Sequence, residues 1–270
     1  MNITFIGGGN MAGAIIGGLL KKGWQPDAIR VAEIDAGARA RLERELRVRV
    51  FADGSAAAVD SACIVFAVKP QHMREAAQAL RGTLKSQLVI TIAAGIRSGD
   101  LARWLGDYQR IVRAMPNTPA LVLAGLSGLY AMPAVPAEDR LQAEKVMGAV
   151  GSTLWLAREE QMDAITAVSG SGPAYVFYFI EALQQAAAEL GFTADEARKL
   201  ALDTFAGAVK LAAHSSEDAA TLRARVTSKG GTTERALDVL ETGKIRQIIA
   251  RAAHAAAERS RELGDEFGKD

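Results

Sequence analysis

The first 158 residues alternate short apolar runs with amphipathic stretches, and this alternation restricts the fold more than any other feature of the chain. Several runs, such as Cys63–Val68, are almost continuously hydrophobic, as expected of strands that are covered on both faces. Helical patterns such as Met11–Lys22 and Ala36–Leu46 lie between the early runs. Because strands that alternate with helices form a parallel, doubly wound sheet, we predict an α/β fold for this part. The predicted strands are Ile3–Ile6, Ile29–Ile34, Val48–Phe51, Cys63–Val68, Leu88–Ile92, Ile111–Met115, Leu126–Ala131 and Thr153–Leu156.

The character of the chain changes after about Glu159. All seven prolines lie at or before Pro173, and the remaining segment is rich in Ala, Leu, Glu, Arg and Lys, which favour helices. We therefore predict an all-α second domain and divide the chain into domains at residues 1–158 and 159–270. Roughly five helices are delimited by breaks at Ser169–Pro173, Gly191–Phe192, His214–Asp218, Ser228–Thr233 and Gly243.

Composition excludes several classes of protein. A formal net charge of +1 gives no basic field for nucleic acid or for anionic lipid. The single cysteine, Cys63, excludes an internal disulfide framework, and the three histidines lie far apart in sequence, so we predict no metal site. No window reaches the ~18 apolar residues of a membrane span, and no basic stretch precedes a long apolar run at the N-terminus. We therefore expect a cytoplasmic protein.

A glycine run follows the first predicted strand and opens the first predicted helix. Its sequence, Gly7-Gly8-Gly9-Asn10-Met11-Ala12, fits the pattern G-x-G-x-x-A. The first glycine allows a tight turn, the second lets the backbone approach a pyrophosphate, and the small third residue lets the helix pack on the strand. Free N–H groups and the positive end of the helix dipole favour phosphate at such a place. We therefore predict a Rossmann-type dinucleotide site; a glycine turn without a ligand is the alternative interpretation.

Two acidic residues, Glu33 and Asp35, stand at the end of the second predicted strand. An acid at this place usually accepts hydrogen bonds from the adenosine ribose, which favours NAD over the 2′-phosphate of NADP. Arg39 and Arg41 are close enough in sequence to offer that phosphate a partner. The sequence therefore leaves the choice between NAD(H) and NADP(H) open, and solvated charges after a strand are the other interpretation.

Two later strands end in small or polar residues, Ala67-Val68-Lys69-Pro70 and Ala93-Ala94-Gly95. Because ligands of open α/β sheets lie beyond the carboxyl ends of the strands, we predict that both segments line the ribose and the nicotinamide; ordinary turns are the alternative. The predicted cofactor-binding residues are Ile6, Gly7, Gly8, Gly9, Asn10, Met11, Glu33, Ser55, Ala67, Val68, Lys69, Pro70, Ala93, Ala94 and Gly95.

Three further segments are candidates for binding a small substrate. In Arg113–Pro119, two prolines around Asn117-Thr118 predict a rigid turn that exposes an amide and a hydroxyl. Ser169-Gly-Ser-Gly-Pro173 precedes an apolar helix, with Pro173 suited to its first position; such a segment can hold a carboxylate or permit a close helix crossing. Val226–Thr233 places adjacent glycines and hydroxyl residues at a helix start, which predicts a backbone concavity for a small carboxylate or, alternatively, only a capped helix.

Together these segments resemble the Δ1-pyrroline-5-carboxylate reductases, which carry out the last step of proline synthesis. The resemblance runs over essentially the whole chain. Family members often have proline where Lys229 stands, and many NADPH-preferring members carry Ser, Thr or Asn around the position of Glu33. The segments that carry the resemblance are Phe5–Ala12, Ala67–Pro70, Ala93–Gly95, Arg113–Pro119, Ser169–Tyr175 and Ser228–Thr233.

This resemblance implies a Rossmann domain followed by a helical domain that interlocks with its twin in a homodimer, in some members assembled further into a decamer. It implies hydride transfer from NADH or NADPH, without a metal, to the imine carbon of the ring, which becomes C5 of L-proline. The backbone around Gly230–Thr233 is expected to hold the substrate carboxylate, and Thr233, as the catalytic residue, to bond the ring nitrogen. The expected substrate-binding residues are Asn117, Ser169, Ser171, Gly172, Ser228, Gly230, Gly231, Thr232 and Thr233.

Two other functions stay open on the sequence. Another NAD(P)-dependent reductase, of the hydroxyacid or imine type, could share this plan of two domains. Many such hydroxyacid enzymes use a lysine on the first helix of the second domain, whereas Ala174–Leu190 contains none. A non-catalytic protein that senses dinucleotides would bind the cofactor without oxidising it when the imine is added.

Overall fold

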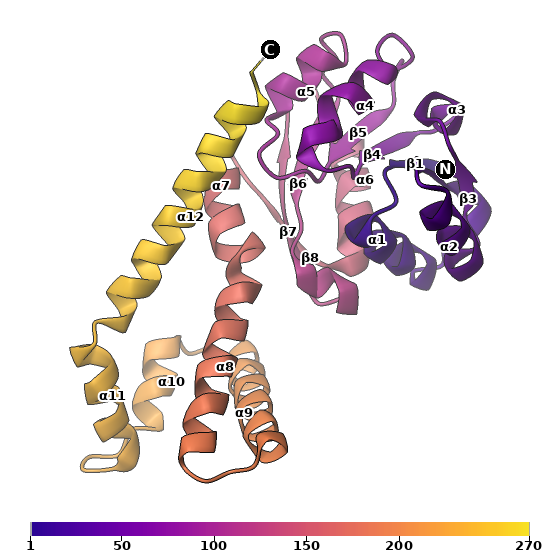
Figure 1. Ribbon diagram of the computed structural model, residues 1–270. Helices are drawn as coiled ribbons and strands as arrows, with labels where there is room; N and C mark the ends of the chain where they lie inside the picture. Colours follow the sequence, from indigo (N-terminus) through magenta and orange to yellow (C-terminus); the bar gives the residue numbers. More distant parts are fainter. Residues whose placement is uncertain (1, 270) are drawn as a thin grey trace. The chain divides into compact units, whose positions relative to one another are not determined.

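The computed structural model describes residues 2–269, and its centre is an eight-stranded sheet in the order β3-β2-β1-β4-β5-β6-β7-β8 (Figure 1). All eight strands lie at the apolar runs that predict them. The first six are parallel, as expected of a doubly wound sheet, whereas β7 runs antiparallel to β6 and β8 runs parallel to β7. The strands are β1 (Ile3–Ile6), β2 (Ile29–Ala32), β3 (Arg49–Phe51), β4 (Cys63–Phe66), β5 (Leu88–Thr91), β6 (Ile111–Met115), β7 (Gly125–Ala131) and β8 (Gly151–Trp155).

Helices cover both faces of this sheet, because alternate strand residues point to opposite sides and both sides are apolar. Ile3 and Phe5 of β1 pack with α1, α2 and α6 in one core, whereas Ile6 packs with α3, α4 and α5 in the other. The sheet is therefore buried between two helical layers. These helices are α1 (Asn10–Lys21), α2 (Ala36–Leu46), α3 (Gly54–Ala58), α4 (Met73–Ala79), α5 (Ser98–Trp104) and α6 (Ala137–Met147).

The rest of the chain is helical, and five of its helices follow the predicted breaks. The break at Ser169–Pro173 takes an unexpected form: residues Thr166–Gly170 form one turn of π-helix that leads into α8, so that Pro173 is the second residue of α8 rather than the first. The helices are α7 (Gln161–Ile165), α8 (Gly172–Glu189), α9 (Ala194–His214), α10 (Ala219–Arg225), α11 (Thr232–Thr242) and α12 (Ile245–Phe267).

The chain forms two compact units. Unit 1 contains residues 2–171 and 255–269, and unit 2 contains residues 172–254, so the helix α12 contributes to both. These two units are defined by how the chain packs. The predicted division into functional domains, between residues 158 and 159, stays a prediction. Within residues 2–269, no helix has the length and apolarity to cross a membrane.

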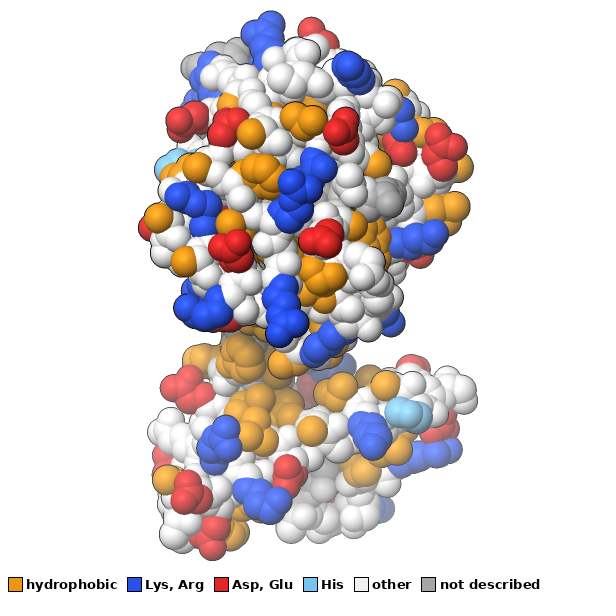
Figure 2. Space-filling view, turned by 90° about the vertical axis from the view of Figure 1, so that its right-hand side faces the viewer, with side chains coloured by type: hydrophobic (Ala, Val, Ile, Leu, Met, Phe, Trp, Pro, Cys, Tyr) orange, Lys and Arg blue, Asp and Glu red, His pale blue; other side chains and the backbone are white. Residues whose placement is uncertain are grey.

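Unit 2 has almost no core of its own. Among its described residues, the buried apolar side chains are only those of Ala187, Ala197 and Ala201. Large apolar side chains lie at its surface instead, including Phe177, which is 63% exposed, and Tyr178, which is 71% exposed. Figure 2 shows hydrophobic side chains at the molecular surface. Exposed large apolar side chains, where they gather into a patch, are typical of sites of protein association.

Candidate active site

The glycine loop joins the ends of three neighbouring strands in unit 1. The Gly7 amide donates to the carbonyl of Ala32 at 2.8 Å, and the Ala67 amide donates to the carbonyl of Ile6 at 2.8 Å. Gly7 has a φ of +97°, and a Cβ there would lie 2.8 Å from the Ala67 carbonyl oxygen. Only glycine fits at this position. The loop lies beside β1, where the order of the strands reverses, and this is the place that binds dinucleotides in such sheets.

The start of α1 suits a pyrophosphate. Gly9 is the N-cap, so no side chain caps the first amides of the helix, and no atom lies within 4 Å of the place where its Cβ would be. A groove of about 390 Å³ runs along α1 from Gly8 and Gly9 to Lys21 and is also lined by α2, from Arg41 to Leu46. The uncapped amides and the free space at Gly9 are what a bound diphosphate requires, so the start of α1 fits a dinucleotide.

Glu33 connects the glycine loop to the turn after β2. Its Oε2 accepts a hydrogen bond from the Gly8 amide at 2.8 Å, and its Oε1 accepts one from the Asp35 amide at 3.0 Å. The guanidinium of Arg39 donates to the backbone carbonyls of Glu33 and Ile34. A carboxylate therefore stands where the adenosine ribose is expected, and Arg39 is engaged with the backbone of the same turn.

The two other predicted cofactor loops also lie at carboxyl ends of strands in unit 1. Ala67–Pro70 follows β4, with Lys69 exposed, and Ala93–Gly95 follows β5. Gly95 is buried and has a φ of +72°. Ser55 lies in α3 after β3, and its hydroxyl donates to the Ala79 carbonyl at 3.1 Å.

Asn117 and Ser169, predicted from separate segments, contact each other. The Asn117 amide nitrogen lies 3.1 Å from Ser169 Oγ and 3.3 Å from the Ser169 carbonyl oxygen, and its Oδ1 accepts from the Leu126 amide at 2.9 Å. Ser169 belongs to the π-helix, whose wide turn is closed by the Ser171 amide donating to Thr166 at 2.7 Å. Single π-helical turns occur often at functional sites. Asn117 thus fixes the backbone of this turn.

The segment 228–233 lies in unit 2 and forms the start of α11. Gly231 is the N-cap without a capping side chain, as predicted for an anion-binding helix start. The Gly230 amide, however, donates to Glu234 Oε2 at 2.6 Å, and the Gly231 amide donates to the Ser228 carbonyl at 3.0 Å. A carboxylate of the chain itself therefore occupies one expected donor. Glu234 is not among the residues predicted to form the site, although an acid three residues after a helix N-cap is a known signal of a capping interaction.

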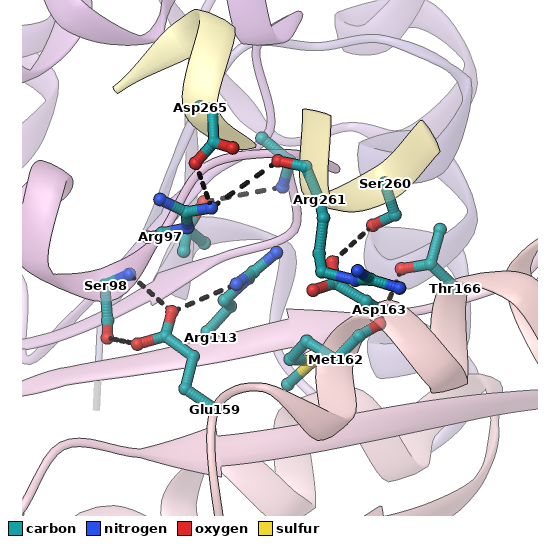
Figure 3. Close-up of polar contacts among 12 residues, drawn as sticks. Arg97, Ser98, Arg113, Glu159, Met162, Asp163, Thr166, Ser260, Arg261 and Asp265 are labelled. Carbon is teal, nitrogen blue, oxygen red and sulfur yellow. Dashed lines mark hydrogen bonds and ion pairs between the residues drawn. The ribbon is translucent and has the colours of Figure 1, made fainter. Parts of the chain in front are cut away.

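A buried ionic cluster near the loop Ala93–Gly95 is also absent from the sequence analysis (Figure 3). The Glu159 carboxylate accepts from the Ser98 amide at 2.7 Å, from the Ser98 hydroxyl at 2.5 Å and from Arg113 at 3.0 Å. Burial, and then the charges of Glu159 and Glu160, raise the pKa of Tyr130. Arg113 is the signal that could have revealed the cluster, because a charge inside a buried strand needs a partner.

The glycine turn after β1, the acid after β2 and the loops at the ends of β4 and β5 define a nicotinamide-dinucleotide-dependent oxidoreductase. Residues 2–95 match a family model described as NADP oxidoreductase coenzyme F420-dependent. Residues 159–263 match the model for pyrroline-5-carboxylate reductase dimerisation. The chain belongs to the pyrroline-5-carboxylate reductase family.

Similarity to individual proteins extends over almost the full length. A pyrroline-5-carboxylate reductase from Pseudomonas aeruginosa is 43% identical, over 99% of this chain and 98% of that protein. The solved reductase from Coxiella burnetii has a TM-score of 0.92 at 41% identity, covering 97% and 98% of the two chains. A Plasmodium falciparum pyrroline carboxylate reductase with NADP bound has a TM-score of 0.88 at 28% identity, covering 98% of each chain.

Proposed function

We propose that this protein reduces Δ1-pyrroline-5-carboxylate to L-proline with a hydride from NADH or NADPH. The observation that carries the proposal is identity of 43% to a reductase of this kind over nearly the whole chain, with both glycine-containing helix starts present. When bound, the reduced nicotinamide supplies the hydride.

The substrate carboxylate is assigned to the backbone amides around Gly230–Thr233, at the positive end of the α11 dipole. The Thr233 hydroxyl is assigned to the ring nitrogen, which it orients through a hydrogen bond. Because a protonated imine is already electrophilic, the chain needs to align the substrate and exclude water more than to supply a strong acid.

The Asn117–Ser169 contact supports a pocket-shaping role for the π-helical turn. Asn117 uses both ends of its amide within the chain, so its part in binding is to hold Ser169 and the following Ser171 and Gly172 in place. The residues that line a pocket for so small a substrate must be held in fixed positions, because a shift of ~1 Å in the alignment of the substrate can lower the rate ~100-fold.

Glu33 supports a preference for NADH within this proposal. Its carboxylate faces the glycine loop, so the 2′-phosphate of NADPH would be brought against a negative charge, whereas a ribose hydroxyl could donate to it. The Arg39 guanidinium, the other candidate partner for that phosphate, is already bonded to the carbonyls of Glu33 and Ile34.

The homodimer, its further assembly into a decamer and a cytoplasmic location belong to the same proposal. The family model for dimerisation covers residues 159–263, and the exposed Phe177 and Tyr178 give unit 2 an apolar surface to bury. Covering such a surface with a second copy would supply the core that unit 2 lacks.

The test is oxidation of reduced cofactor by the purified protein, followed by nicotinamide absorbance, with pyrroline-5-carboxylate as the second substrate. The proposal expects imine-dependent oxidation with NADH, and with NADPH at lower kcat/KM. A dinucleotide-sensing protein would bind the cofactor and leave the absorbance unchanged, and a hydroxyacid dehydrogenase would respond to a hydroxy or keto acid instead.

A further inference from the structure

Glu159 makes three hydrogen bonds that converge on one carboxylate in unit 1 (Figure 3). Its Oε2 accepts from the Ser98 hydroxyl at 2.5 Å, and its Oε1 accepts from the Ser98 amide at 2.7 Å and from Arg113 Nη1 at 3.0 Å. The side chains of Arg113 and Glu159 are only 7% and 22% exposed. Charge-assisted bonds of this kind, in a site with little water, are strong and directional.

The first partner, Ser98, controls the end of a cofactor loop. Ser98 is the first residue of α5 and follows Gly95 by three positions, so its amide and hydroxyl fix where the segment after Ala93–Gly95 ends. The N-cap of α5, Arg97, has no side-chain cap bond, so Glu159 takes the place of a capping side chain at this helix start. Movement of Glu159 would therefore move the loop that is assigned to the nicotinamide.

The second partner, Arg113, stands at the base of the substrate loop. It lies on β6, four residues before Asn117, and Asn117 holds Ser169. One carboxylate thus links a segment assigned to the cofactor with a segment assigned to the substrate.

The helix α12 holds the other side of the same cofactor loop. Arg97 donates to Asp265 at 2.6 Å, and a Cβ on Gly95 would lie 3.1 Å from Leu263 and from Phe267. The loop therefore packs against α12 at Gly95, and the segment that follows it is bonded to Glu159 at Ser98.

The same unit offers an ion pair for comparison. Arg110 and Asp139 approach to 2.7 Å, and their side chains are 29% and 6% exposed, so this pair also combines one well-buried member with one partly exposed member. Arg110 precedes β6 at its amino end, whereas the cofactor loops follow the carboxyl ends of the strands parallel to it. Loss of either pair should lower stability, but of these two carboxylates only Glu159 bonds the residue at which the segment after the cofactor loop ends, Ser98.

We propose that Glu159 is a positioning residue of the reductase: by bonding Ser98 and Arg113 together, it sets the nicotinamide loop against the substrate loop for hydride transfer. This inference rests on the proposed function. It assigns no contact between Glu159 and either reactant.

The experiment compares Glu159→Gln with Asp139→Asn, each of which removes one carboxylate charge from a buried pair. Three quantities are measured: deuterium uptake of residues 93–98 in the cofactor-free protein, kcat and KM for both substrates, and the isotope effect on kcat with cofactor deuterated at the transferred position. Thermal unfolding is recorded for both variants, so that a general loss of stability is seen separately.

Glu159→Gln is expected to speed exchange in residues 93–98, to lower kcat about tenfold with little change in the imine KM, and to raise the isotope effect, because misalignment slows the hydride step itself. Asp139→Asn is expected to leave all three near the wild-type values. Wild-type exchange and a wild-type isotope effect in Glu159→Gln, or equal changes in both variants, would overturn the inference. A wild-type protein without imine-dependent oxidation would overturn the proposed function instead, while the exchange measurement would still report on the loop.

Discussion

The Gly8 amide donates a hydrogen bond to Glu33 Oε2 at 2.8 Å, which brings a carboxylate onto the loop that is assigned to the pyrophosphate. A Cβ on Gly8 would lie 2.5 Å from Leu42 Cδ1 and 3.4 Å from Glu33 Oε2, so a side chain there would displace the tip of Leu42. The bonds to the Gly8 and Asp35 amides therefore hold the acid beside the glycine loop, where the adenosine end of the cofactor is expected.

Replacement of Glu33 by serine should move the cofactor preference toward NADPH. The change removes the charge that repels a 2′-phosphate and introduces a hydroxyl that can donate to it. We expect the ratio of kcat/KM for NADPH to that for NADH to rise about tenfold or more, which corresponds to ~1.4 kcal/mol. Steady-state kinetics with both cofactors measures the ratio.

Asp35→Ser is the matched control for this change. Asp35 caps α2 by accepting from the Ala38 amide at 2.6 Å, and serine preserves a capping oxygen there. This control should leave the ratio near the wild-type value. An unchanged ratio in Glu33→Ser would mean that Glu33 does not select the cofactor.

Thr233→Ala should reduce kcat/KM for the imine by ~1–3 kcal/mol of transition-state stabilisation, because the variant lacks the hydroxyl that is assigned to the ring nitrogen. Thr233→Ser keeps the hydroxyl and should retain most of the activity. Thr242→Ala, at the other end of α11, controls for general effects on the helix. Near-wild-type kinetics of Thr233→Ala would remove the role given to Thr233.

Glu234→Gln should tighten binding of the imine carboxylate. Glu234 accepts from the Gly230 amide at 2.6 Å, so it competes for a donor that is assigned to the substrate and adds a like charge beside it. We expect KM for the imine to fall severalfold, roughly 2–10-fold, with kcat little changed. A KM that rises would indicate instead that Glu234 holds the loop in its binding conformation.

Cys63 should resist thiol reagents as long as the protein is folded. Its side chain is fully buried on β4, and burial, followed by the charge of Asp139, raises its pKa, so that almost no thiolate forms near neutral pH. Labelling with a thiol reagent should be at least about a hundredfold slower in the native protein than in denaturant. Rapid stoichiometric labelling under native conditions would contradict this burial.

Much of unit 1 could be predicted because its strands are covered on both faces. Runs such as Cys63–Val68 and Leu88–Ile92 are apolar for that reason, and each contains the strand that the structure has. The antiparallel direction of β7 could not be predicted, because an apolar run does not show whether its strand pairs parallel or antiparallel to the neighbouring strand. The π-helical turn at Thr166–Gly170 could not be predicted either, because glycine and serine are compatible with several kinds of helix start.

The candidate site was predictable where it depends on local sequence and less so where it depends on distant partners. The glycines and Glu33 lie next to elements that the pattern already predicts, whereas Ser98 and Glu159 are 61 residues apart and meet only through the fold. Asn117 and Ser169 were predicted separately, and only the structure relates them, at a separation of 52 residues.

The most direct test of the central claim follows the hydride into its product. The wild-type protein is supplied with pyrroline-5-carboxylate and reduced cofactor that carries deuterium at the transferred position, and the amino acid formed is analysed by mass spectrometry and nuclear magnetic resonance. Reduction of the imine predicts L-proline with one deuterium at C5. Absence of proline, or proline without the label at that carbon, would contradict the account.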